Sequence, residues 1–99
     1  MNKDIFKKVF NEGKTKFRDY MIVRIETEGN PDPEYIINPS GNFDQKYRYY
    51  MEAYNDDMEL IKAKENGKLI KITHMRTFNS LHIIPTIIKN WEEASNEND

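Results

Sequence analysis

Four carboxylates, those of Glu26, Glu28, Asp32 and Glu34, flank one loop that contains two prolines and a glycine. Prolines of this kind end one strand before another begins, so we expect the four side chains to surround the tip of a hairpin. Carboxylates gathered at a tip can bind a basic protein surface, in the way that nucleic-acid phosphates do. The alternative is that they only keep the tip solvated.

Four lysines in a later segment offer the opposite chemistry: Lys62, Lys64, Lys68 and Lys71. If this segment forms a hairpin, three of these side chains point to solvent from one face of a sheet and the fourth lies at its turn. Ammonium groups on such a face can contact phosphates. Lysines also keep a sheet face soluble and protect strand edges from pairing, which is the simpler interpretation.

Catalytic and metal-binding chemistry finds little support in the residue pattern. The chain has two histidines, His74 and His82, and no cysteine. We expect Glu59 to face His74 across the hairpin, which favours a cross-strand ion pair over a catalytic pair. The acidic residues Asp56, Asp57 and Glu59 lack the oxygen spacing of a calcium loop, and nothing at metal-site spacing surrounds the histidines. We therefore expect no enzymatic activity, no metal and no cofactor.

The hairpin that would position the lysines is predicted by Asn66-Gly67, the pair that a two-residue type I′ turn favours. In that register Ile61 faces Ile72 and Ala63 faces Ile70. Aliphatic side chains then share one face of the sheet, and lysines share the other.

Apolar periodicity predicts the remaining elements. We expect a helix from an Asn2 or Asp4 cap to Gly13, strands over about 17–28 and 34–38, and a helix that Asn42 opens through a capping box with Gln45. A C-terminal helix is expected over 85–95, with 81–84 left open between helix and strand. The sequence thus predicts an α+β domain over residues 1–95 in the order α-β-β-α-β-β-α, followed by a frayed acidic tail over 96–99. Two hairpins would form a four-stranded antiparallel sheet with the helices on one face.

Tyrosines crowd the middle helix. Tyr47, Tyr50 and Tyr54 share the apolar spacing of Phe43, whereas Tyr49 falls off that face. An exposed tyrosine is a common anchor in protein interfaces, so we expect Tyr49 to contact a partner.

Composition limits the class of protein. The chain has 99 residues, a net charge of −2 and an aromatic content of 12 %, which indicates one folded domain. No apolar run approaches the roughly 18 residues of a membrane span, and the N-terminal segment does not resemble a signal peptide. We expect a cytoplasmic protein that does not bind membranes. The core of such a small domain leaves room for a homodimer.

Residues 34–59 carry a distinctive block: Tyr35-Ile-Ile-Asn-Pro, Asn42-Phe43, Lys46, Tyr49-Tyr50 and Ala53-Tyr54-Asn55-Asp56-Asp57. This block resembles one in small uncharacterised accessory proteins of Gram-positive bacterial phages and prophages. There it runs as a strand ending in Asn-Pro, a capped helix with paired tyrosines and a further strand. The resemblance implies a phage or mobile-element protein that binds a host protein stoichiometrically, such as a CRISPR–Cas nuclease (an anti-CRISPR function), a restriction enzyme or a replication factor.

Two functions are therefore weighed. The favoured one is a non-enzymatic inhibitor that binds a host protein through the four loop carboxylates and Tyr49. The alternative is a nucleic-acid-binding accessory protein that uses the four lysines on a basic sheet face.

Overall fold

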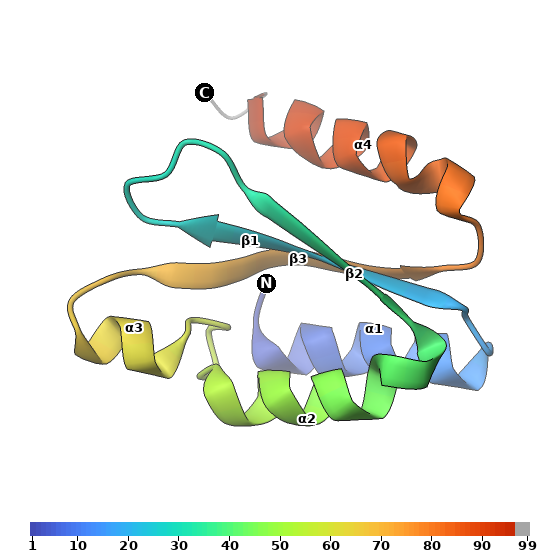
Figure 1. The fold of residues 1–99 in the computed structure, drawn as a ribbon, viewed down its shortest axis with the longest axis horizontal. Helices are drawn as coiled ribbons and strands as arrows, with labels where there is room; N and C mark the ends of the chain where they lie inside the picture. Colours follow the sequence, from blue (N-terminus) through green and yellow to red (C-terminus); the bar gives the residue numbers. More distant parts are fainter. Residues whose placement is uncertain (97–99) are drawn as a thin grey trace.

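The computed structural model describes residues 1–96, and the predicted tail over 96–99 lies outside this range apart from its first residue (Figure 1). The described elements are α1 (Lys3–Thr15), β1 (Tyr20–Thr27), β2 (Glu34–Pro39), η1 (Ser40–Asn42), α2 (Phe43–Ala53), α3 (Ile61–Glu65), β3 (Ile70–Phe78), η2 (Leu81–Ile83) and α4 (Ile84–Asn96). The class is α+β, as predicted.

The sheet has three antiparallel strands in the order β2-β1-β3, so the prediction of four strands is wrong. Val23 at the centre of β1 lies opposite Ile36 of β2 and Met75 of β3. The register between β1 and β3 shifts between Arg24 and Ile25, which indicates a β-bulge in the partner strand.

The missing strand is a helix, because Asn66-Gly67 ends α3 instead of turning a hairpin. Gly67 has a φ of +75°, but Asn66 has a φ of −96°, and a type I′ turn needs both angles positive. The amide of Gly67 donates to the Lys64 carbonyl (3.0 Å) and the amide of Lys68 donates to the Ala63 carbonyl (2.9 Å). These two bonds define a Schellman motif, in which glycine takes the left-handed position after the helix.

The predicted cross-strand register fails with that hairpin. Ile61 lies in α3 and is 38 % exposed, so it does not face Ile72 in a sheet. Glu59 forms an isolated bridge with Lys71, and His74 lies opposite Arg24 of β1. The expected pair of Glu59 with His74 is therefore wrong.

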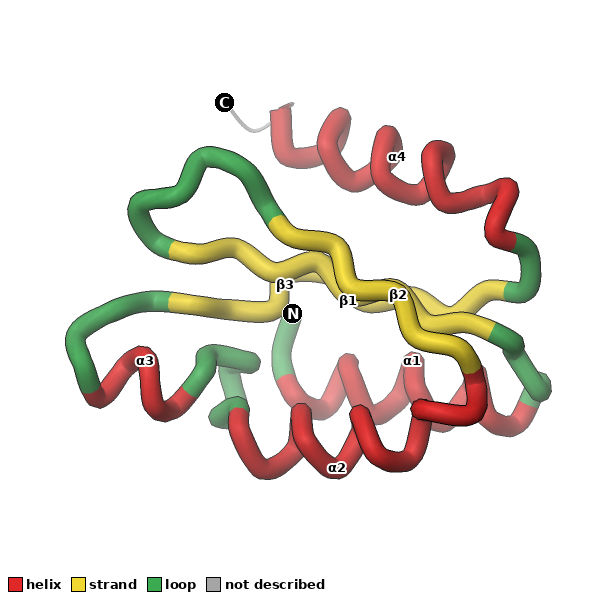
Figure 2. Tube along the Cα trace, viewed as in Figure 1, coloured by secondary structure: helices red, strands yellow, loops and turns green. Residues whose placement is uncertain are grey.

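Helices cover both faces of the sheet, which corrects the prediction that they share one face. Figure 2 shows α1, α2 and α3 on one side and α4 on the other. The physical reason lies in β1, whose residues Met21 to Ile25 are all buried. A strand that is buried on both faces needs a covering layer on each side.

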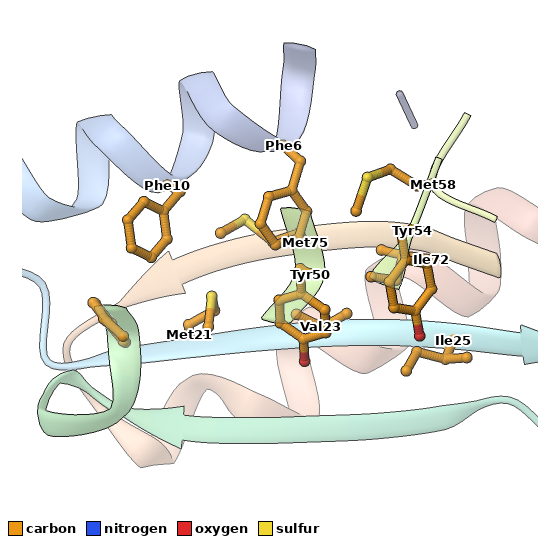
Figure 3. Packing of buried hydrophobic residues seen from close by; sticks show 11 residues of the cluster. Phe6, Phe10, Met21, Val23, Ile25, Tyr50, Tyr54, Met58, Ile72 and Met75 are labelled. Carbon is orange, nitrogen blue, oxygen red and sulfur yellow. The ribbon is translucent and has the colours of Figure 1, made fainter. Parts of the chain in front are cut away.

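Two clusters of apolar side chains hold these layers together. Figure 3 shows the larger one, where Phe6 and Phe10 of α1 and Tyr50 of α2 pack near Met21 and Val23. The smaller one joins the opposite face to α4 through the buried side chains of Ile22, Phe78 and Ile87.

Of the predicted helix ends, one is confirmed and two are wrong. The Asn2 side chain accepts a hydrogen bond from the amide of Ile5 (2.9 Å) and so caps α1. The helix does not end at Gly13 but continues to Thr15, and a Cβ atom on Gly13 would lie 2.5 Å from Thr77 Cγ2 of β3. The predicted capping box at Asn42 is wrong, since its side chain makes no capping bond.

Candidate functional site

Two of the predicted partner-binding residues lie in β2 and α2: Glu34 begins β2, and Tyr49 lies in α2. Tyr49 is 48 % exposed, which confirms that it lies off the buried face of α2. Its ring meets that of Tyr54 at 6.2 Å in an edge-on contact, and that of Tyr50 at 5.5 Å. Two buried rings therefore support the exposed one.

Glu34 belongs to the same region. Burial raises the pKa of the Tyr54 hydroxyl, and the charges of Tyr49, Tyr50 and Glu34 raise it further. These effects place Glu34 within electrostatic reach of Tyr54, the ring that contacts Tyr49. We call Glu34, Tyr49 and Tyr54 the α2–β2 edge.

A cation completes the surroundings of Tyr49. Lys46 Nζ lies 5.9 Å from the centre of the Tyr49 ring, within the range of a cation–π contact. Tyr49 is thus a supported aromatic ring with one ammonium group beside it, and the carboxylate of Glu34 acts on the neighbouring Tyr54. Such an arrangement can fit a mixed apolar and polar protein surface.

The other loop carboxylates do not join this edge. Glu26 accepts a hydrogen bond from Arg24 Nη1 at 2.7 Å, and Glu28 accepts one from the amide of Leu69 at 2.9 Å. Strand alternation also puts Glu26 on the face that α4 covers, opposite to the face of Glu34. Asp32 is exposed on the loop, where its amide donates to the Asn30 side chain. The four carboxylates therefore do not form one anionic tip: Glu26 and Glu28 bind groups of the chain itself, and Glu34 lies on the opposite face of the sheet from Glu26.

The four lysines do not share a sheet face. Lys62 and Lys64 lie on α3, and Lys64 pairs with Glu59 at 2.8 Å. Lys68 follows α3, whereas Lys71 lies on β3 opposite Glu26. The predicted basic sheet face is wrong because α3 replaces the strand that would have carried it.

A buried arginine connects the sheet to α4, and the sequence analysis missed it. The Arg24 side chain is 5 % exposed, and it donates from Nη1 to Glu26 and Thr73, and from Nε to Glu92 at 2.9 Å. The Tyr35 hydroxyl also donates to Glu92. An arginine inside the apolar run of residues 21–25 was the signal for this network.

The electrostatics of the network support a structural role. Burial alone would lower the pKa of Arg24, but hydrogen bonds to Glu26 and Glu92 raise it overall. The bonds from Tyr35 and then from Arg24 lower the pKa of Glu92. Both groups are therefore charged at neutral pH, and the network holds α4 against the sheet.

His74 lies away from Glu59, its predicted partner, and contacts other residues. His74 packs 5.1 Å from the Trp91 ring, and its Nδ1 lies 2.9 Å from the Thr73 hydroxyl. Burial and then the charge of Arg24 lower the pKa of His74, so its ring is neutral at pH 7. Within residues 1–96, no three His, Asp or Glu side chains come together as a metal site requires.

One exposed aromatic residue also escaped the sequence analysis. The sequence predicts a strand from about residue 17, but Phe17 precedes β1 and is 87 % exposed. Its φ of +53° lies in the left-handed region. Phe17 is an even number of residues from Met21 and Val23, so the period-two pattern extends the predicted strand too far toward the N-terminus.

In the part of the chain that the structure covers, no helix combines the length and the apolar character needed to cross a membrane. Comparison of the chain with models of protein families, with curated proteins and with solved structures found no match.

Proposed function

We propose that this chain is a non-enzymatic phage or mobile-element protein that binds and inhibits a host protein. The partner belongs to a defence system, such as a CRISPR–Cas or restriction enzyme, or to the replication machinery. The observation that carries the proposal is the half-exposed Tyr49 ring, held by two buried tyrosines beside Glu34.

Rigid aromatic side chains contribute strongly to binding because they lose little conformational entropy on association. Contacts with Tyr50 and Tyr54 already fix Tyr49, so little ordering remains for the partner to impose. Glu34 adds negative charge on the β2 side, which favours a partner with basic groups around an apolar pocket.

The strand β2 supports the same proposal. It stands at one end of the sheet order, so within residues 1–96 it pairs with β1 on one side only. Edge strands can pair with an extended segment of another protein. The resemblance of residues 34–59 to phage accessory proteins covers this strand and α2, and it supports the kind of partner.

The proposal is tested by capture of partners from a Gram-positive bacterial lysate, followed by quantitative mass spectrometry. The paired variant Tyr49→Ala with Glu34→Lys should lose the captured host protein, while Lys62→Glu on the exposed surface of α3 should retain it. Charge reversal at Glu26 or Glu28 is unsuitable, because both side chains hold the chain's own structure. If the paired variant captures the same protein as the wild type, the assignment to the α2–β2 edge is wrong.

A further inference from the structure

Phe17 has a backbone conformation that is unfavourable for an L-residue other than glycine. The amide of Phe17 donates to the Lys14 carbonyl (3.1 Å) and the amide of Arg18 donates to the Gly13 carbonyl (2.9 Å). These bonds form a Schellman motif at the end of α1, with Phe17 in the left-handed position that usually belongs to glycine. At the end of α3, the same motif in this chain uses Gly67.

The exposure of Phe17 means that burial of its ring does not offset this strain. The chain has five phenylalanines, and the other four, Phe6, Phe10, Phe43 and Phe78, are at most 3 % exposed. Phe17 is 87 % exposed. Backbone strain that burial does not offset is typical of positions that contact another molecule, which points to such a contact at Phe17.

Basic side chains line two hollows at this end of α1, and Phe17 lines one of them. A hollow of about 220 Å³ beside the end of α1 is lined by the basic side chains of Lys16, Arg18 and Arg76, with Glu12 as its one carboxylate. A second hollow of about 190 Å³ is lined by Phe17 and Arg18 together with Lys14, Ser40, Phe43 and Asp44. Asp44 is paired with Lys14, whereas Arg18, which lines both hollows, has no ion pair within the described residues.

We propose that this end of α1 binds single-stranded nucleic acid, with a base stacked on Phe17 and the adjacent phosphates bound by Lys16, Arg18 and Arg76. Aromatic rings flanked by lysine and arginine are the usual elements of sequence-tolerant single-strand binding. The site is distinct from the α2–β2 edge and does not depend on the proposed host protein.

The surroundings of Phe17 favour a nucleic acid over a protein surface. Protein hot spots lie within a broader apolar contact that excludes water. Among the residues that line the two hollows, Phe17 is the only exposed apolar side chain. An isolated ring beside Arg18, with Lys16 and Arg76 in the neighbouring hollow, matches one stacked base next to phosphates better.

The test is the fluorescence anisotropy of a labelled oligothymidylate and of a matched duplex, titrated with the full chain at low salt. We expect the single strand to bind more tightly than the duplex. Phe17→Gly should weaken single-strand binding by about 5- to 150-fold, the range found when one stacking ring is removed. Phe17→Tyr keeps a stacking ring and should bind as the wild type does.

Salt dependence tests the phosphate contacts separately. Each phosphate contact on a single strand contributes about −0.7 to the slope of log K against log salt concentration. Arg76→Gln should therefore lower the magnitude of the slope by about 0.7 while binding remains specific for single strands. The variant Tyr49→Ala with Glu34→Lys should bind the oligonucleotide as the wild type does, so this result is independent of the host-protein proposal.

Three outcomes would overturn the proposal. The first is equal binding by the wild type and Phe17→Gly, provided that both remain folded by circular dichroism. The second is equal affinity for single strand and duplex, which would indicate charge attraction alone. The third is Phe17-dependent binding of an acidic peptide with no anisotropy change for DNA, which would assign the site to a protein partner.

Discussion

Replacing Phe17 with glycine should stabilise the protein, although it removes a large apolar side chain. An L-residue in the left-handed region costs about 1–2 kcal/mol, and glycine avoids that cost. Glycine loses more conformational entropy on folding than phenylalanine does, and this loss offsets about 0.5–1 kcal/mol of the gain. Since Phe17 is 87 % exposed, little buried area is lost with the ring. We expect the free energy of unfolding to rise by about 0.5–1 kcal/mol.

Urea unfolding followed by circular dichroism measures this change, and a rise in the thermal midpoint of about 2–8 °C should accompany it. Gly67→Ala is the matched control, because it introduces a side chain at the equivalent position of α3. That variant should lose about 1 kcal/mol. A Phe17→Gly protein that is less stable than the wild type would show that the ring packs against the fold, and would refute the argument.

Three further predictions concern the core. Arg24→Ala should lower the free energy of unfolding in urea by about 2–3 kcal/mol, since it removes the link to α4 but leaves carboxylates that water can still reach; an unchanged midpoint would contradict the network. Stability should fall as the pH drops below 6.5, because the folded state lowers the pKa of His74 and the unfolded chain binds the proton first. It should fall again below pH 4.5 as Glu92, whose folded pKa is also lowered, takes up a proton, and His74→Gln should flatten only the first decline in pH-dependent melting curves. Gly13→Ala should cost about 1–3 kcal/mol through its clash with Thr77, and Thr77→Ser should restore part of this loss; equal stability of Gly13→Ala and the wild type would exclude close packing of α1 on β3.

The sequence identified most elements where local patterns are unambiguous. The cap at Asn2, the apolar face of α2 and the loop prolines before Glu34 each act within a few residues, so periodicity and turn chemistry were sufficient to find them. Asn66-Gly67 was ambiguous, because glycine there suits a hairpin turn as well as the end of a helix. Only tertiary pairing distinguishes the two, and Glu59 and Leu60 take the pairing positions beside the start of β3.

The site residues were harder to predict for a related reason. The role of Arg24 depends on Glu92, which lies far along the chain and reaches it only because α4 returns across the sheet. Glu26 and Glu34 lie on opposite faces of the sheet, and α4 covers the face of Glu26. A prediction that places all helices on one face cannot anticipate this separation. The exposure of Tyr49 followed from helical spacing alone and was predicted correctly.

The most direct test of the proposed function is a titration of the captured host protein's own activity with the purified chain. The account predicts that inhibition saturates at a fixed molar ratio, and that Tyr49→Ala with Glu34→Lys shifts the titration to much higher concentration while leaving the urea midpoint unchanged. Full inhibition by that variant, or a host protein whose activity is unaffected by a saturating amount of the wild-type chain, would contradict it.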